Sequence, residues 1–308
     1  MMVFKNTLPL DSLELFANQV VEGFITGMHK SPYHGFSVEF AEHRLYNTGE
    51  STRDIDWKLF GRTDKLFVKR YDEETNLRCQ LILDTSSSMY YPNFNTPTFE
   101  NPNKILFSIT AIASLMNLFK RQRDAVGLSA CANEVHIHTP SKTTTRHHRL
   151  LYHELDKILS IDALKYNRKT TLSESLHHIA ERIHRRSLVI LFTDMIEEDN
   201  AIDSVFSAFK HLRHKKHEII LFYLTEPKTE HNFSFKNRPY KFIDIETQEE
   251  IKLNPIQYKE SYKKASKEYL KNIRLKCLQY KIDLVEVDIN QSLEQILISY
   301  LLKRKKMF

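Results

Sequence analysis

Three nearly continuous runs of apolar residues most constrain the fold of this chain. They read LILD, LVILFTD and IILFYL, and each is bounded by polar or charged residues. A strand that is apolar on both faces is typical of a parallel sheet covered by helices on either side. Stretches with the helical spacing of apolar residues alternate with these runs, so the sequence predicts a doubly wound α/β fold with a mostly parallel sheet.

The predicted elements follow one another without an internal repeat. Strands are expected near 79–83, 126–131, 135–138, 188–193, 218–224 and 281–289. Helices are expected at 104–121, 147–159, 171–184, 201–213 and about 256–278. In the helix at 104–121, apolar side chains recur every three or four residues, as an amphipathic helix requires.

The chain is expected to divide into two domains, 1–77 and 78–308. The first begins with an amphipathic helix over 11–27 and continues into turn-rich sequence with short stretches such as DWKLF and KLFVKRY. This pattern predicts a small strand-rich module. The second domain carries the α/β alternation, interrupted by a polar hairpin insertion near 229–253.

Composition excludes several classes of protein. Hydrophobic residues make up 41% and charged residues 27%, which is ordinary for a globular protein and too apolar for disorder. No apolar run approaches the ~20 residues of a membrane-spanning helix, and the N-terminus lacks the pattern of a secretory signal. The cysteines, Cys79, Cys131 and Cys277, are widely separated and predict neither a disulfide framework nor a zinc site. We therefore expect a cytoplasmic protein.

The positive charge of the chain raises the question of nucleic-acid binding. The formal net charge is +6, but the basic runs at 146–149, 211–217 and 303–306 are scattered and lack interleaved stacking aromatics. They are typical of solvated helix faces and a charged tail. Nucleic-acid binding is therefore kept only as an alternative, and it would show a steep loss of affinity with salt.

Polar oxygen-bearing side chains follow two of the apolar strands. Asp84, Ser86 and Ser88 come at the end of the first strand, and Asp194 ends a later one. In open α/β sheets, ligands collect beyond the carboxyl ends of the strands. Carboxylate and hydroxyl oxygens are hard ligands, so Mg²⁺ is the expected ion, with Mn²⁺ and Ca²⁺ as alternatives.

This pattern resembles the metal-ion-dependent adhesion site of von Willebrand factor A domains, a Rossmann-type fold. Asp84, Ser86 and Ser88 match the first loop of that site, Asp-x-Ser-x-Ser, and Asp194 matches the third. The resemblance implies a threonine ligand from a second loop, for which Thr170 is the best candidate. The glycines usual in that loop are absent here and Thr171 is adjacent, so both threonines remain open.

A second resemblance extends over nearly the whole chain. It is carried by the stretch FAEHRLYNTGESTRDIDWKLFGRTDKLFVKRYDEE, by the Asp84 loop and by KRQRDAVGLSACANEV. In these stretches the chain resembles a bacterial family known as domain of unknown function number fifty-eight. Its members are typically encoded beside AAA+ ATPases of the MoxR type. The resemblance implies an adaptor or co-chaperone for such an ATPase.

Together these patterns predict a binding protein and not an enzyme. A metal ion held by neutral hydroxyls and water-bridged carboxylates would capture an Asp or Glu of a partner protein. The enzymatic alternative is a haloacid dehalogenase-like phosphotransferase with Asp84 as nucleophile. That chemistry normally has an acidic general acid/base two positions later, where this chain has Ser86.

Overall fold

The computed structural model describes residues 10–28, 43–46, 57–69, 77–92, 97–132, 134–160, 172–196, 201–244, 249–294 and 298. They belong to two compact units. The larger unit combines Met1–Ile25 with Leu77–Phe308, and the smaller is Thr26–Asn76.

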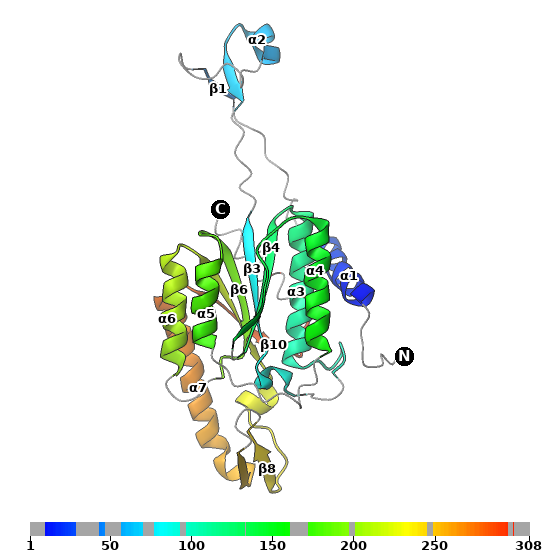
Figure 1. The fold of residues 1–308 in the computed structure, drawn as a ribbon. Helices are drawn as coiled ribbons and strands as arrows, with labels where there is room; N and C mark the ends of the chain where they lie inside the picture. Colours follow the sequence, from blue (N-terminus) through cyan, green and yellow to red (C-terminus); the bar gives the residue numbers. More distant parts are fainter. Residues whose placement is uncertain are drawn as a thin grey trace. The chain divides into compact units, whose positions relative to one another are not determined.

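A six-stranded sheet forms the centre of the larger unit (Figure 1). Its order is β10-β7-β6-β3-β4-β5, and every neighbouring pair is parallel except β4 and β5. The strands are β3 Arg78–Asp84, β4 Ala125–Cys131, β5 Val135–His138, β6 Leu188–Thr193, β7 Glu218–Thr225 and β10 Asp283–Asp288. This order confirms the predicted doubly wound, mostly parallel α/β fold.

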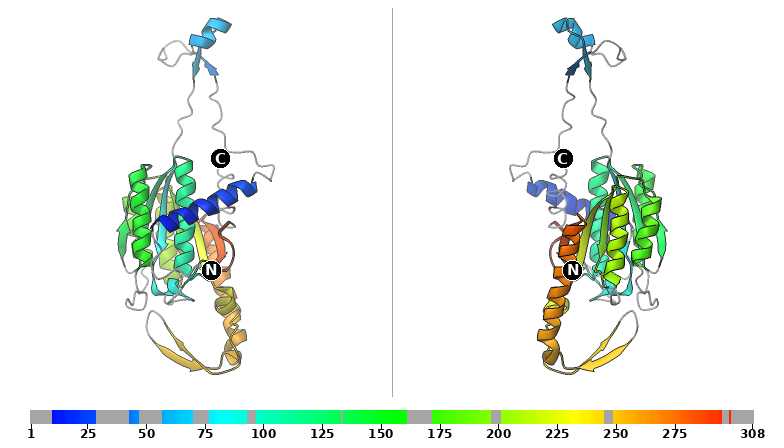
Figure 2. Two further views of the ribbon diagram at one scale, coloured as in Figure 1. Left: turned by 90° about the vertical axis from the view of Figure 1, so that its right-hand side faces the viewer. Right: turned by 90° about the vertical axis from the view of Figure 1, so that its left-hand side faces the viewer.

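Helices cover both faces of the sheet (Figures 1 and 2). They are α3 Lys104–Arg121, α4 Thr145–Leu159, α5 Leu172–Arg182, α6 Ala201–His214 and α7 Pro255–Gln279. One face packs against α5, α6 and α7, in a core that includes Ile82, Leu191 and Leu221 from three neighbouring strands. Alternate residues of a strand point to opposite faces, so Leu81 and Leu83 lie on the other face, which α3 and α4 cover.

The opening helix α1, Leu10–Met28, lies against the α/β unit. Its residues Leu13 and Val21 are buried, and Glu14 forms an ion pair of 3.4 Å with Lys120 of α3. The sequence placed this helix with the N-terminal module. Its apolar face instead packs with the larger unit, and this corrects the predicted boundary for residues up to 25.

The smaller unit contains two short antiparallel strands, β1 His43–Leu45 and β2 Phe67–Lys69. Between them in sequence lies the helix α2, Trp57–Thr63. The residues WKLF are therefore helical, whereas the sequence predicted a strand-rich stretch there. Trp57 and Phe60, three residues apart, meet edge-to-face at 6.2 Å, because that spacing brings side chains together on a helix surface.

An arm extends from the larger unit beyond the carboxyl ends of the strands (Figure 2). It consists of the single turn η4 Pro227–His231, the antiparallel pair β8 Tyr240–Ile243 and β9 Glu250–Leu253, and the first half of α7. The pair confirms the hairpin expected near 229–253. Phe233 stacks on Tyr262 of α7 at 4.4 Å and so fastens the hairpin to the helix.

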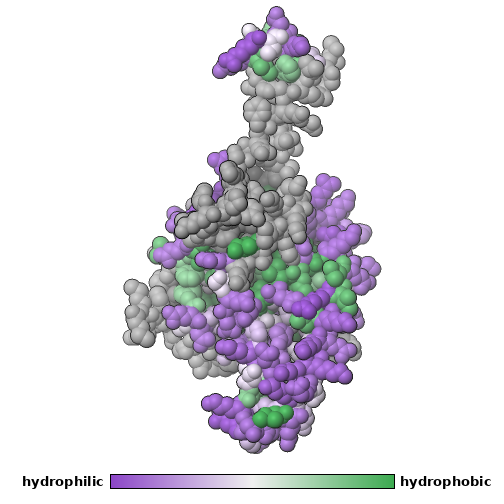
Figure 3. All heavy atoms as spheres, turned by 180° about the vertical axis from the view of Figure 1, so that it is seen from behind, coloured by the Kyte–Doolittle hydropathy of each residue, from purple (hydrophilic) through white to green (hydrophobic). Residues whose placement is uncertain are grey.

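The surface of the arm is mostly hydrophilic (Figure 3). Helix α7 carries seven basic and two acidic residues, and only Pro255, Ile273 and Cys277 of it are buried. In the part of the chain that the structure describes, no helix is long and apolar enough to cross a membrane.

Candidate metal site

The strands β3 and β6 place the candidate residues at one edge of the sheet. They are parallel neighbours, and Leu83 pairs with Phe192, so Asp84 and Asp194 leave the sheet side by side. From β3 the chain crosses to β4 on one side, and from β6 it crosses to β7 on the other. Such a reversal of strand order is where open α/β sheets bind ligands.

Asp84 is held by neutral donors from its own loop and from β6. Its Oδ1 accepts a hydrogen bond from the backbone N–H of Ser86 at 2.9 Å, and its Oδ2 accepts one from the Thr193 hydroxyl at 2.6 Å. Burial, with the negative charge of Asp194 nearby, raises the pKa of the Asp84 carboxyl to about 6. Among the described residues, no positively charged group hydrogen-bonds to this carboxylate.

Two hydroxyls connect Asp84 to Asp194. Ser86 Oγ lies 3.1 Å from Ser88 Oγ, and Ser88 Oγ lies 3.2 Å from Asp194 Oδ1. Neighbouring ligands of an octahedral Mg²⁺ ion lie roughly 2.9–3.0 Å apart, because each is about 2.0–2.1 Å from the metal. The three oxygens are within a few tenths of an ångström of this spacing, so the residues fit a small divalent cation.

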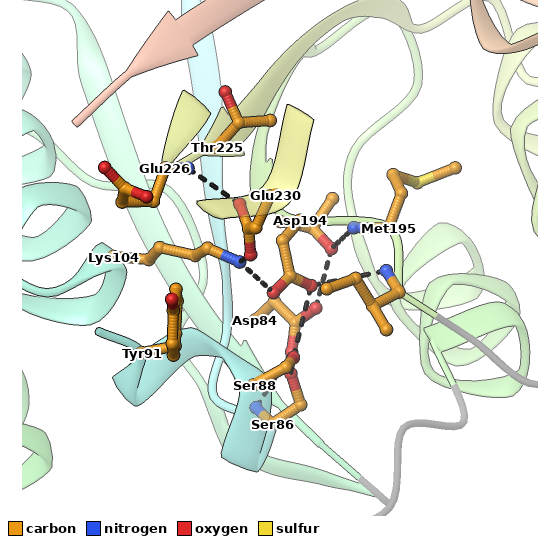
Figure 4. A network of polar contacts seen from close by, with 12 residues as sticks. Asp84, Ser86, Ser88, Tyr91, Lys104, Asp194, Met195, Thr225, Glu226 and Glu230 are labelled. Carbon is orange, nitrogen blue, oxygen red and sulfur yellow. Dashed lines mark hydrogen bonds and ion pairs between the residues drawn. The ribbon is translucent and has the colours of Figure 1, made fainter. Parts of the chain in front are cut away.

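Lys104 is a member of the site that the sequence analysis missed (Figure 4). Its side chain is fully buried, and its ammonium group lies 2.8 Å from Asp194 Oδ2 and 2.5 Å from Glu230 Oε1. Burial alone would lower the pKa of Lys104, but the two carboxylates outweigh that effect and raise it. Lys104 is therefore charged.

Glu230 joins the site to the arm. Burial raises the pKa of its carboxyl group, and the neighbouring charge of Lys104 opposes that effect. Its other oxygen, Oε2, accepts a hydrogen bond of 2.7 Å from the backbone N–H of Glu226. Helix α7 contacts both sides of the site. The Ser266 hydroxyl donates a hydrogen bond to the Glu230 carbonyl, and the Tyr269 hydroxyl donates one to the carbonyl of Met195, next to Asp194.

One sequence signal could have identified Lys104. It is the first residue of α3, directly after Asn103, whose side chain caps the helix by accepting from Leu106 N. A cation at a helix N-terminus is unfavourable, since the helix dipole is positive there. Glu230 gives no such signal, because its position in the site depends on the path of the chain after β7.

The structure brings together four of the five predicted ligands: Asp84, Ser86, Ser88 and Asp194. Thr170 and the alternative Thr171 lie outside the described residues. Among the residues that the structure places, no group of three or more His, Cys, Asp or Glu could hold a metal ion. The oxygens of two carboxylates and two hydroxyls are thus the donor set to consider, and they suit a hard cation.

Known proteins resemble this chain at low identity. It is 22% identical over 187 residues to uncharacterized proteins of Mycobacterium bovis and Mycobacterium tuberculosis. The match covers 61% of this chain and 56% of each relative, so the chain spans about half the length of these curated relatives.

Two solved structures match this chain at low identity and low TM-score. The conserved hypothetical protein BatB from Bacteroides thetaiotaomicron has 16% identity and a TM-score of 0.41, with 75% of this chain and 100% of that chain covered. The VWA domain of SpRpn10 has 12% identity and a TM-score of 0.40, with 72% and 94% covered.

A family model gives the assignment. It matches residues 42–271, which include parts of both units, among them the strands β3 and β6 and the arm. Since this match spans more than half of the chain, the chain belongs to the family described as Protein of unknown function DUF58.

Proposed function

We propose that this protein is a metal-dependent adaptor that binds a partner protein by capturing one of its carboxylates. The observation that carries the proposal is the row of oxygens from Ser86, Ser88 and Asp194, spaced at 3.1 and 3.2 Å. That spacing suits Mg²⁺, with Mn²⁺ or Ca²⁺ as alternatives. The bound ion would supply a positive charge for a ligand from outside the chain.

The surroundings of the two aspartates support capture of an external carboxylate. Both oxygens of Asp84 accept hydrogen bonds from the chain, and one oxygen of Asp194 is paired with Lys104. The oxygens that remain to bind a metal ion directly are mostly those of neutral hydroxyls. An ion held in this way keeps part of its charge, so an Asp or Glu from a partner is a favoured further ligand.

The proposed partner is an AAA+ ATPase of the MoxR type, or a client protein of one. This proposal rests on the resemblance of the chain to its family. The sequence has no GxxxxGK[ST] phosphate loop, so ATP hydrolysis would belong to the partner. The three cysteines are buried, which is consistent with action in the reducing cytoplasm.

Affinity capture from native lysate tests the proposal. The bait proteins are the wild type, Asp84→Ala and the control Asp203→Ala, whose carboxylate lies on the exposed surface of α6. We expect wild type and control to retain a MoxR-type ATPase with Mg²⁺ and to lose it with EDTA. Asp84→Ala should fail to retain it in either buffer. The proposal would be contradicted if the ATPase is retained equally with Mg²⁺ and with EDTA, and equally by wild type and Asp84→Ala.

Catalysis is not part of the proposed function. A phosphotransferase with Asp84 as nucleophile would need a proton donor near the leaving group, and the position two residues later is Ser86. We expect the purified protein with Mg²⁺ to hydrolyse no generic phosphate ester such as p-nitrophenyl phosphate. Turnover that disappears in Asp84→Asn would favour the phosphotransferase instead.

A further inference from the structure

The ion triad of Asp194, Lys104 and Glu230 adds a fixed charge to the candidate metal site. The Lys104 side chain has 0% exposure, and its ammonium lies between carboxylates at 2.8 and 2.5 Å. A fully buried lysine is rare and occurs almost only when it is paired. Lys104 also lies at the N-terminus of α3, where the helix dipole disfavours a cation.

Stability alone does not account for this arrangement. Replacing a buried ion pair or triad with apolar residues of similar volume is often neutral or stabilising. A triad that bridges a candidate metal site and the arm therefore suggests a role in binding. Its members carry opposite charges, so they should act on a nearby cation in opposite directions.

The geometry shows how the triad acts on the metal position. One oxygen of Asp194, Oδ2, accepts from Lys104, while Oδ1 faces Ser88. The same carboxylate is thus shared between a permanent cation and the row of oxygens that would hold the metal. Coulomb repulsion between the ammonium and a divalent ion is weakly screened in such a buried site. Glu230 offsets part of that repulsion.

We propose that Lys104 lowers the intrinsic affinity of the site for its divalent cation and that Glu230 raises it. The two residues together hold that affinity at a level where firm metal binding depends on a carboxylate from the partner. Lys104 thereby couples metal binding to partner binding. This inference rests on the proposed metal-dependent function, and it extends that function to how occupancy of the site is controlled.

Titration calorimetry with Mn²⁺ alone tests the inference on the full chain. Lys104→Met removes the positive charge and keeps a long apolar side chain, and Glu230→Gln removes the negative charge with little change in shape. We expect Lys104→Met to bind Mn²⁺ at least about tenfold more tightly than wild type, and Glu230→Gln at least about tenfold more weakly. Tighter binding after a buried charge is removed cannot result from misfolding.

Matched controls separate this effect from general changes in charge. Lys120→Met makes the same substitution at the other end of α3, where the side chain is 39% exposed. Glu268→Gln removes an exposed carboxylate from α7. Both controls should bind Mn²⁺ as wild type does. Circular dichroism melts of every variant establish that it is folded at the temperature of the titration.

Each outcome separates the inference from the function on which it rests. Wild type that binds Mn²⁺ with Lys104→Met weaker or unchanged would overturn the inference and leave the metal site standing. Unchanged affinity in Glu230→Gln would overturn it as well, including where Lys104→Met does not fold. Absence of Mn²⁺ binding in every folded variant would overturn both the inference and the proposed metal site.

Discussion

The two aspartates of the candidate site lie on neighbouring strands but in different electrostatic surroundings. Among the described residues, the groups that hydrogen-bond to Asp84 are neutral and belong to Ser86 and Thr193. Asp194 instead pairs with the ammonium of Lys104, which also contacts Glu230. In the part of the chain that the structure describes, the negative charge of Asp194 is thus paired with a cation, whereas Asp84 contacts neutral groups.

This difference assigns separate roles to the two carboxylates. The uncompensated Asp84 supplies attraction for a cation and makes the site unfavourable without one. Asp194 is part of an internal ion triad and gives the site a fixed shape. Replacing the two residues one at a time should therefore change stability in opposite directions.

The largest expected effect comes from Asp194→Ala. The substitution leaves Lys104 buried with Glu230 as its remaining partner, and breaking a buried pair in this way costs about 3–5 kcal/mol of unfolding free energy. Urea denaturation in EDTA measures the loss. The control is Asp203→Ala, which removes an ion pair between the exposed Asp203 and Lys276 and should cost about 1 kcal/mol or less. Equal losses in the two variants would contradict the assigned role of Asp194.

Asp84→Asn should have the opposite effect in metal-free protein. The pKa of this carboxyl rises from 3.8 to about 6 on folding, so the folded state holds the proton more tightly than the unfolded state. Near pH 4 the carboxyl is largely protonated when folded and ionisation costs little. Above pH 6 it is ionised in both states, and the folded state bears the full cost of a buried charge. Wild type should therefore lose about 2–3 kcal/mol relative to Asp84→Asn between pH 4.5 and 7.5.

Urea denaturation of both proteins in EDTA at several pH values measures this difference. Comparison with Asp84→Asn cancels the titration of groups that the two proteins share. If the unfolding free energies of the two proteins change in parallel with pH, burial of the ionised Asp84 carboxylate does not destabilise the folded state.

The surroundings of Asp84 were much easier to predict from the sequence than those of Asp194. Asp84, Ser86 and Ser88 form a local motif at the end of an apolar strand, so a short stretch of sequence contains the whole pattern. The doubly wound, mostly parallel fold also followed from the pattern, because apolar strands alternate with amphipathic helices along the sequence. The triad could not be found in this way, since Lys104 and Glu230 are 126 positions apart.

The errors in the predicted fold have a similar origin. The helix α1 looked like part of the N-terminal module because it is adjacent in sequence, but its buried residues Leu13 and Val21 pack with the larger unit. The stretch that begins at Trp57 is too short for its periodicity to separate a strand from a helix. Tertiary packing decides both cases, and local sequence does not report it.

A smaller effect concerns competition between protons and metal at Asp84. Since its pKa is about 6, the carboxyl must release a proton before it can favour a cation below that pH. Apparent Mn²⁺ affinity should fall about tenfold between pH 7.5 and pH 5, measured by calorimetry. Glu230→Gln should lower the affinity at pH 7.5 while a comparable pH-dependent fall remains. A pH-independent affinity would mean that Asp84 does not contribute its charge to metal binding.

The smallest effect concerns the link between the Asp194 side and the arm. The Tyr269 hydroxyl on α7 donates to the carbonyl of Met195, the residue after Asp194. Tyr269→Phe leaves that carbonyl without this donor and should cost about 1 kcal/mol of unfolding free energy, measured by urea denaturation. The control Tyr258→Phe, on the same helix with 52% exposure, should change stability by less than about 0.5 kcal/mol. Equal effects of the two substitutions would show that the arm adds nothing to the stability of the Asp194 loop, and the comparison between the two aspartates would then rest on the ion triad alone.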